Sequence, residues 1–237
     1  MSETALSHLL IAHGSPDPRH RAVMQTLATE VSDRGLSCSV AFLEHDAPSV
    51  PEALATASAD VVALGMLLAP GYHATVDVPR LLANAPPELT VHNLGPLGAG
   101  EWLFSTLDWL VADVDAEPGT PVILATAGST REAARVALAK FASDWQSTRS
   151  GDVVVASGTG PGASLEDAVG RYAVDRMPAG VRAQPAVVLP LKISPGVLAD
   201  RALDVAEKHG LLSAGTLAES PLFLDVLVDR LGSRSEG

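Results

Sequence analysis

The chain alternates short, nearly continuous apolar runs with segments of helical periodicity, and this alternation most restricts the folds open to it. Residues 8–12, 37–44 and 60–69 form apolar runs, while 19–35 and 49–59 between them carry apolar residues at helical spacing. Such repetition is typical of a parallel sheet covered by helices on both faces. Strands buried on both faces lack a regular alternation of polarity, as these runs do. We therefore predict an α/β fold.

A second copy of this pattern begins after an acidic, turn-rich segment, residues 113–121. Three segments recur in the same order. The pairs are LLIAHGSPDPRHRAV with ILATAGSTREAARVA, SVAFLEHDAPSVPEAL with DVVVASGTGPGASLEDAV, and VVALGMLLAPGYHATVDVPRLL with AVVLPLKISPGVLADRALDV. An ordered triple of this kind indicates internal duplication. We predict two lobes, residues 1–115 and 116–237, the second a degenerate copy that completes a cleft.

Three ionisable side chains of the first copy are missing from the second. The alignment of the copies sets His13 against Ala127, Glu44 against approximately Ser157, and His73 against Leu198. Backbone signals that end strands and begin helices are kept in both copies, as in Gly14 with Gly128 and Pro70-Gly71 with Pro195-Gly196. The first lobe is therefore predicted to carry the chemistry, and the second to carry only the fold.

His13, Glu44 and His73 each lie just past the carboxyl end of a predicted strand. In open parallel sheets, ligands bind in the crevice outside those ends, so we expect the three side chains to converge. Two imidazoles and a carboxylate make either a divalent-metal site or an acid–base site. Imidazole suits both tasks, because near neutral pH its free nitrogen can coordinate a metal ion or accept a proton.

Neighbouring residues receive simpler interpretations. Gly14 would permit a close approach of the backbone, and Ser15 would cap a helix. Asp77 is a candidate cap for the helix that begins at Val78, and His45 is predicted to be a surface residue that points elsewhere. The remaining histidines, His8, His20, His92 and His209, are interpreted as non-catalytic.

Composition excludes several classes of function. The formal net charge of −12 disfavours nucleic-acid binding. No apolar run reaches the roughly 20 residues of a membrane-spanning helix, and no export signal is visible at the N-terminus. The single cysteine, Cys38, cannot form an internal disulfide, which agrees with a reducing compartment. We expect a cytoplasmic protein with no membrane or nucleic-acid partner.

The segments LLIAHGSPDPRH, VAFLEHDAPSVPEAL and LLAPGYHATVDVPRLL, with NLGPLG after them, resemble the sirohydrochlorin chelatases of the CbiX and SirB type. These are class II chelatases. The resemblance implies two flavodoxin-like, chelatase-like lobes that face each other across a cleft. It also implies insertion of Fe2+ or Co2+ into sirohydrochlorin, for sirohaem or cobalamin biosynthesis. The metal-handling histidines of the family fall on His13 and His73, and its active-site glutamate falls on Glu44.

The implied substrate is a tetrapyrrole with many carboxylates, so local cations and backbone N–H groups must offset the acidic chain. Candidate substrate-binding residues are Gly14, Ser15, Arg19, Gly71, Arg80 and Lys192. The divalent metal is expected as a substrate, with no tightly bound cofactor, and the fused lobes predict a monomer. Two alternatives stay open: a non-catalytic protein that binds or delivers metal or tetrapyrrole and, ranked below it, a phosphate-handling hydrolase with His13 as nucleophile.

Overall fold

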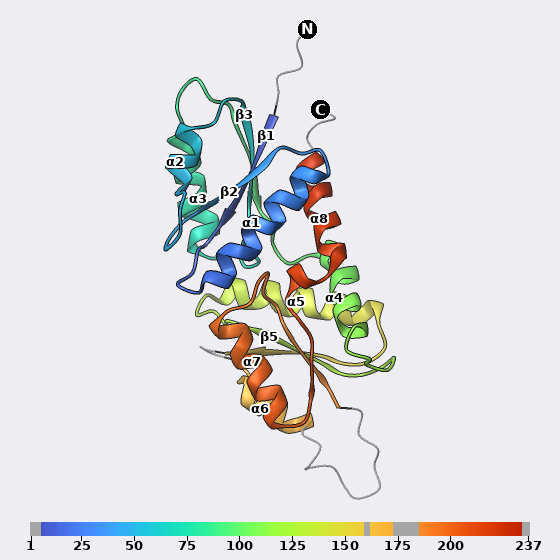
Figure 1. Cartoon of the computed structure of the whole chain (residues 1–237). Coiled ribbons are helices and arrows are strands. Elements are labelled where there is room, and N and C mark those ends of the chain that lie inside the picture. Colours follow the sequence, from blue (N-terminus) through green and yellow to red (C-terminus); the bar gives the residue numbers. More distant parts are fainter. Residues whose placement is uncertain (1–5, 159–161, 173–184, 234–237) are drawn as a thin grey trace, which may run out of the picture. The chain divides into compact units, whose positions relative to one another are not determined.

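Two four-stranded sheets, each entirely parallel, form the framework of the protein (Figure 1). The computed structural model describes residues 6–158, 162–172 and 185–233. The first sheet contains β1 (Leu6–Ala12), β2 (Cys38–Phe42), β3 (Asp60–Gly65) and β4 (Val91–Pro96). The second contains β5 (Val122–Thr126), β6 (Val153–Ser157), β7 (Val187–Pro190) and β8 (Leu212–Ser213). Their strand orders, β2-β1-β3-β4 and β6-β5-β7-β8, are the same topology, as the duplication predicts.

Helices connect the strands and begin at local sequence signals. The Asp17 side chain accepts a hydrogen bond from the Arg19 backbone N–H, and Ser49 with Glu52 forms a capping box. The helices are α1 (Pro18–Asp33), α2 (Val50–Ala55), α3 (Val78–Ala83), α4 (Phe104–Ala112), α5 (Glu132–Thr148), α6 (Leu165–Tyr172), α7 (Val197–Lys208) and α8 (Pro221–Gly232). Shorter elements are the π-helical turn η1 (His73–Asp77) and the 3-10 turns η2 (Glu101–Leu103) and η4 (Leu217–Glu219).

Both faces of the first sheet are buried. Leu9 and Ile11 of β1 pack in one cluster with residues of α2 and α3. Because side chains alternate along a strand, Leu10 points to the opposite face, on which α1 lies (Figure 1). This arrangement explains the continuous apolar runs of the sequence, and it confirms the predicted layers of helix, sheet and helix.

The second sheet repeats these layers with α6 and α7 on one face. Ile123 and Ala125 of β5 belong to one cluster with residues of those two helices. α4 and α5 pack together, with the rings of Phe104 and Phe141 at 5.7 Å between centroids. The fully buried Trp145 donates a hydrogen bond from Nε1 to Asp108 Oδ1 at 3.0 Å. Each sheet therefore has its own core.

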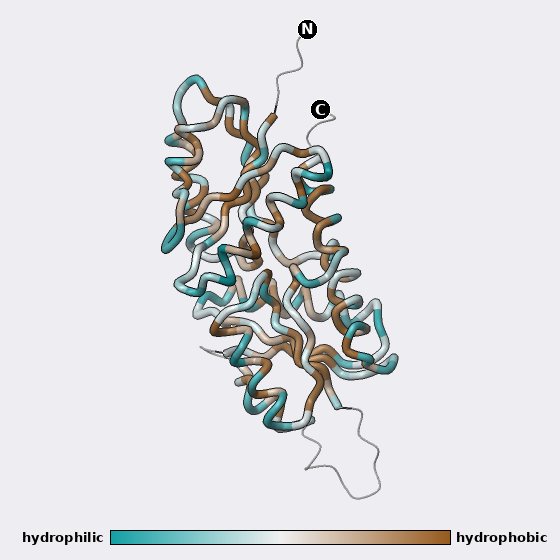
Figure 2. Tube along the Cα trace, in the orientation of Figure 1, coloured by the Kyte–Doolittle hydropathy of each residue, from teal (hydrophilic) through white to brown (hydrophobic). Residues whose placement is uncertain are grey.

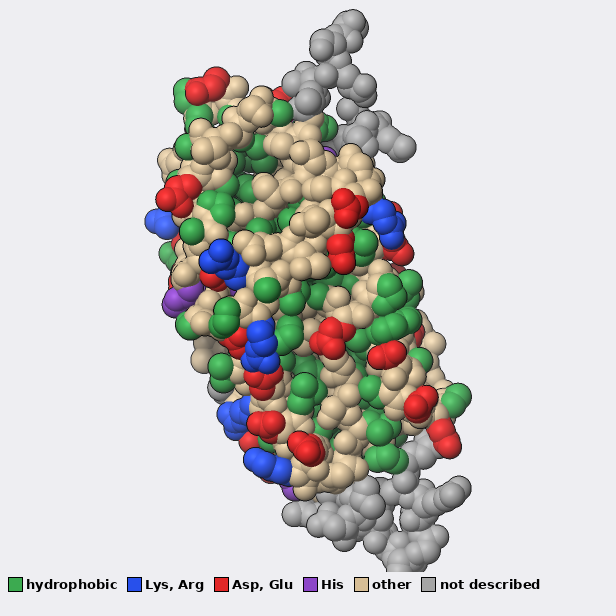
Figure 3. All heavy atoms as spheres, in the orientation of Figure 1, with side chains coloured by type: hydrophobic (Ala, Val, Ile, Leu, Met, Phe, Trp, Pro, Cys, Tyr) green, Lys and Arg blue, Asp and Glu red, His purple; other side chains and the backbone are tan. Residues whose placement is uncertain are grey.

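Hydropathy follows the layers, since the strands are the most consistently apolar segments and the helices alternate between polar and apolar residues (Figure 2). Over the part of the chain that the structure describes, no helix combines the length and the apolar character needed to span a membrane. On the face drawn in Figure 3, acidic and basic side chains are interspersed.

The structure confirms the duplication and corrects one detail of its alignment. Gly14 and Gly128 both adopt positive φ, at 90° and 84°, directly after the first strand of each sheet. Ala12 pairs with Phe42 and Thr126 pairs with Ser157, so Phe42 is the residue that corresponds to Ser157. The predicted match of Glu44 with Ser157 is therefore wrong by two positions. The true counterpart, at 159, lies outside the described residues.

The compact units of the chain differ from the predicted lobes, 1–115 and 116–237. One unit comprises residues 1–98 and 224–237, and the other comprises 99–223. α4 follows the first sheet in sequence but belongs to the second unit, while most of α8 follows the second sheet but belongs to the first. An ion pair between Arg34 and Asp225, at 3.1 Å, joins the end of α1 to α8. An apolar helical stripe does not specify which sheet it covers, so the exchange could not be predicted.

Candidate metal and proton-transfer site

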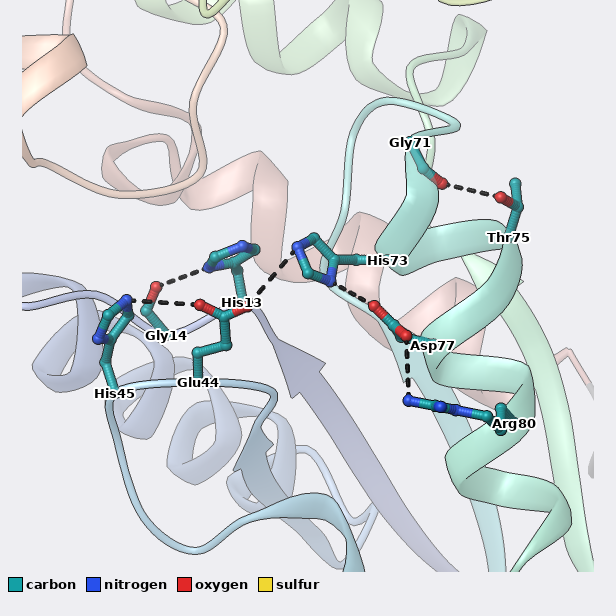
Figure 4. Close-up of polar contacts among 9 residues, drawn as sticks. All are labelled: His13, Gly14, Glu44, His45, Gly71, His73, Thr75, Asp77 and Arg80. Carbon is teal, nitrogen blue, oxygen red and sulfur yellow. Dashed lines mark hydrogen bonds and ion pairs between the residues drawn. The ribbon is translucent and has the colours of Figure 1, made fainter.

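The three ionisable residues predicted to converge lie together in the first unit (Figure 4). His13 follows β1, Glu44 follows β2, and His73 begins η1 after β3. Each residue offers one ligand atom, and these atoms all lie within 4.8 Å of one another. Parallel strands end at one edge of a sheet, which explains why residues far apart in the sequence meet here.

The cluster is compact, and part of it is open to solvent. His73 Nε2 lies 3.8 Å from Glu44 Oε1. The rings of His13 and His73 meet edge to face, with centroids 4.6 Å apart and planes at 88°. The two histidines are half-buried and Glu44 is exposed, so a small cation can reach the ligand atoms. Imidazole nitrogen and carboxylate oxygen together suit Fe2+ and Co2+, and both groups also accept protons.

Gly14 holds the loops of His13 and Glu44 against each other. Its φ is +90°, and a Cβ atom at this position would collide with the backbone oxygen of Glu44. The Glu44 N–H donates to the His13 oxygen at 2.9 Å, and the Ser15 N–H donates to Asp46 Oδ2 at 3.1 Å. Gly14 and Ser15 therefore have positioning roles here, while their contact with substrate stays a prediction.

Asp77 does not cap α3, contrary to the sequence-based interpretation. Its side chain makes no capping hydrogen bond to that helix. Instead, Asp77 Oδ2 accepts a hydrogen bond from His73 Nδ1 at 2.8 Å, and Asp77 Oδ1 accepts one from Arg80 at 3.3 Å. An aspartate before Val-Pro carries the signal of a helix start, so the sequence pattern concealed this role.

His45 also differs from its prediction as a residue that points elsewhere. Its Nε2 lies 3.6 Å from Glu44 Oε2, so the carboxylate of Glu44 faces an imidazole on each side. His45 adopts a positive φ of 64°, which non-glycine residues rarely do. This backbone conformation turns the side chain back toward Glu44, and no local sequence signal indicates it.

The predicted cationic contacts are distributed over both units. Arg19 forms an ion pair with Asp17 at 2.6 Å, and Arg80 contacts Asp77 at 3.3 Å. Gly71 lies at the start of the helical segment that carries His73, and its oxygen accepts a hydrogen bond from Thr75. Lys192 belongs to the second unit, just past β7. Burial lowers the pKa of its ammonium group. Binding of substrate by these residues stays a prediction.

At the counterpart of the His73 segment, the second unit keeps the same backbone hydrogen bond without the imidazole. The Gly71 oxygen accepts from the Thr75 N–H, and the Gly196 oxygen accepts equivalently from the Asp200 N–H. This match places Leu198, an exposed apolar residue, at the position of His73. In the described ranges of the chain, His13, Glu44 and His73 are the group found with metal-ligand spacing.

Comparison with known proteins gives its family match over the first lobe. The CbiX family model matches residues 7–114, the segment that holds the cluster. The sirohydrochlorin cobaltochelatases of Methanocaldococcus jannaschii and Methanococcoides burtonii are 31% and 32% identical to this chain over 80 and 84 residues. These alignments cover 31% and 33% of this chain. The chain spans only 56% and 64% of the length of these two relatives.

Solved structures extend the likeness to both lobes. SirB from Bacillus subtilis with Fe3+ superposes with a TM-score of 0.78 at 17% identity, covering 98% of this chain and 97% of SirB. CbiX, described as the terminal enzyme for siroheme biosynthesis in denitrifying bacteria, has a TM-score of 0.70 at 20% identity, covering 96% and 99%. At these identities the structures show a shared fold, and the family match comes from the first lobe. Residues 7–114 are therefore similar to the CbiX family, and the chain as a whole has the fold of SirB and CbiX.

Proposed function

We propose that this protein is a sirohydrochlorin chelatase, which inserts a divalent metal ion, Co2+ or Fe2+, into the tetrapyrrole as a step toward cobalamin or sirohaem. The observation that carries the proposal is the His13, Glu44 and His73 cluster inside the segment that matches the CbiX family. The names of the two curated relatives support the same substrate and favour cobalt as the first metal to test.

Metal insertion makes two demands on a protein, and this cluster meets both. Two pyrrolic N–H protons must leave as the cation enters, so bases are needed beside the metal. His13, His73 and Glu44 can accept them. The ligands must also release the ion, which a closed cage of thiolates would hold tightly. Burial raises the pKa of Cys38 to about 12, so this single thiol does not compete for the metal.

Metal coordination and proton uptake can be assigned to individual atoms of the cluster. His73 Nε2 and Glu44 Oε1, 3.8 Å apart, face the entering cation together with His13. The His13 Nδ1 group lies 3.0 Å from the Gly14 carbonyl oxygen, which can only accept, so Nδ1 is the donor and Nε2 keeps its lone pair. As the metal passes to the macrocycle, the ligand atoms are freed to take up the displaced protons.

The decisive experiment is an anaerobic insertion assay with the full chain. Sirohydrochlorin and Co2+ or Fe2+ are mixed with and without protein, and conversion of the absorption spectrum is followed. We expect faster conversion with protein present. Tight spectral binding of sirohydrochlorin with an unchanged rate would contradict catalysis and favour a protein that only binds or delivers the tetrapyrrole.

We further propose that the chain acts as a cytoplasmic monomer with no tightly bound cofactor. Duplication supplies both lobes within one chain, so pairing of two copies is unnecessary for a two-lobed architecture. The net charge of −12 opposes long-range attraction of nucleic acid. Sedimentation of the purified protein at several concentrations tests the oligomeric state, and a dimer at the lowest concentration would contradict it.

Among the cationic residues predicted to bind a carboxylate of the substrate, Lys192 has the environment that favours this role most. Its side chain forms no ion pair or hydrogen bond among the described residues, and burial lowers its pKa. A substrate carboxylate would compensate for this desolvation. We expect Lys192→Met to raise the KM for sirohydrochlorin about tenfold or more, because a hydrogen bond between charged groups contributes about 1.5–3 kcal/mol.

The matched control for this prediction is Lys140→Met. Lys140 is exposed on α5 and forms an ion pair with Asp144 at 2.6 Å, so its loss should leave the KM for sirohydrochlorin unchanged. Co2+ affinity, measured by calorimetry, should be unaffected in both variants. An unchanged KM in Lys192→Met would remove this residue from the substrate site.

A further inference from the structure

The two histidines of the cluster differ in the partner of their second nitrogen. His13 Nδ1 donates to a neutral backbone carbonyl, that of Gly14, at 3.0 Å. His73 Nδ1 lies 2.8 Å from Asp77 Oδ2, and the side chain of Asp77 is largely buried, with 16% exposed. Figure 4 shows the carboxylate on the side of the His73 ring that faces away from Glu44. The two imidazoles are therefore not electrostatically equivalent.

The contact between His73 and Asp77 spans the π-helical turn η1, which is an unusual element. The Val78 N–H donates to the His73 oxygen, which closes the wider turn. Val78 and Ala202 are buried in corresponding clusters of the two lobes, and Gly71 corresponds to Gly196. The stretch from Gly71 to Val78 is one residue longer than the corresponding stretch from Gly196 to Ala202. The π turn is thus an insertion present in the first lobe only.

The inserted turn coincides with the acidic partner of His73. In the second lobe, Arg201 and Ala202 are the residues that could correspond to Asp77, and neither is a carboxylate. Leu198 replaces His73 there. Histidine, carboxylate and π turn are therefore present together in one lobe and absent together from the described part of the other. Single-turn π insertions of this kind occur frequently at functional sites.

We propose that Asp77 is a positioning residue that makes His73 the stronger metal ligand of the two histidines, an inference that rests on the proposed function. The carboxylate holds the proton on Nδ1, so the lone pair of Nε2 is directed toward Glu44 and the entering ion. An anionic acceptor also increases the donor strength of the imidazole, and loss of such partners typically weakens metal binding about 10–100-fold. Arg80 restrains the carboxylate from its other oxygen, at 3.3 Å.

This assignment predicts which histidine captures the metal ion and which one releases it first. His73, with Glu44 beside it, captures the ion, and His13, held only by a neutral carbonyl, is the ligand that dissociates more readily when the macrocycle competes. Arg80, whose binding of substrate stays a prediction, also contributes to the support of His73. Two histidines that look alike in the sequence thereby receive different tasks.

The test combines a spectroscopic and a binding measurement on the full chain. Long-range 1H–15N NMR of the imidazoles, at a pH where they are neutral, reports which nitrogen carries the proton. We expect Nδ1–H for His73 in the wild type and a mixture of tautomers in Asp77→Ala. Calorimetric titration with Co2+ alone should show about 10–100-fold weaker binding in Asp77→Ala. Asp77→Asn, which keeps an acceptor oxygen, should retain the tautomer and lose less affinity.

The control is Glu166→Gln, which removes a carboxylate paired with Arg201 at 2.7 Å in the second lobe, and Co2+ affinity should not change. A proton on His73 Nε2 in the wild type, or unaltered Co2+ affinity in Asp77→Ala, would overturn the inference. If Asp77→Ala does not fold, the tautomer of His73 in the wild type and the Co2+ affinity of Asp77→Asn still test the inference. Co2+ binding that depends on Asp77 without metal insertion would overturn only the proposed function.

Discussion

Replacement of His13 or His73 by alanine should reduce the rate of metal insertion by about 10²-fold or more in either variant, with the fold intact. Each imidazole is both a ligand and a proton acceptor, and positioned bases contribute about 10²–10⁴-fold to reactions of this type. Both side chains are half-buried at a sheet edge, outside the cores that stabilise the lobe. His13→Ala should change the free energy of unfolding by less than about 0.5 kcal/mol. His73→Ala should cost about 1–3 kcal/mol, because the largely buried carboxylate of Asp77 loses its imidazole partner.

Two measurements separate loss of chemistry from loss of structure in these variants. Insertion rates are compared at saturating Co2+, and thermal unfolding is followed by circular dichroism. His209→Ala, at the end of α7 in the second lobe, removes an imidazole that is not part of the cluster and should retain the wild-type rate. Full activity in both His13→Ala and His73→Ala would mean that the reaction takes place elsewhere.

Gly14→Ala should abolish Co2+ binding through a purely steric effect on Glu44. A methyl group at Gly14 meets the backbone oxygen of Glu44, and the loop that carries this glutamate must move to relieve the collision. Since the ligand atoms of the cluster lie within 4.8 Å of one another, a displacement of about 1 Å is enough to disturb coordination and transfer. We expect both Co2+ affinity and insertion rate to fall to background.

Gly35→Ala provides a matched control for the strain of a positive φ. Gly35 has a φ of +92°, close to the +90° of Gly14, but nothing lies within 4 Å of a Cβ atom built there. The positive φ by itself should cost each alanine about 1–2 kcal/mol of unfolding free energy, because left-handed conformations disfavour a Cβ. Gly14→Ala should cost more, because its methyl group also collides with the Glu44 backbone. Only Gly14→Ala should lose Co2+ binding as well. Wild-type Co2+ affinity in Gly14→Ala would contradict the positioning role of this glycine.

The convergence of the site was predictable because of a property of parallel sheets. All strands of such a sheet end at one edge, so residues that follow different strands meet without any knowledge of distances. His13, Glu44 and His73 needed only a correct assignment of the three strands. The internal repeat helped to select the two histidines as functional residues. In the second lobe, which keeps the same topology, Ala127 and Leu198 occupy the corresponding positions.

The partners of these residues were not predictable, since local patterns admit more than one role. Asp77 before Val-Pro carries the signal of a helix cap, yet its carboxylate binds His73 across a π turn. The backbone conformation of His45, with φ of 64°, turns its ring toward Glu44. The sequence pattern also leaves open which sheet α4 and α8 cover, and the structure assigns each helix to the unit of the other repeat.

For this protein, the sequence by itself determined the two parallel sheets, their duplication and the three side chains that meet at one edge. Strand and helix periodicity, together with the direction of parallel strands, is sufficient for those results. Only the tertiary structure decided which groups hold the ligands in place and which helices complete each lobe. Those outcomes depend on backbone torsions and on contacts between distant segments, which neighbouring residues in the chain do not encode.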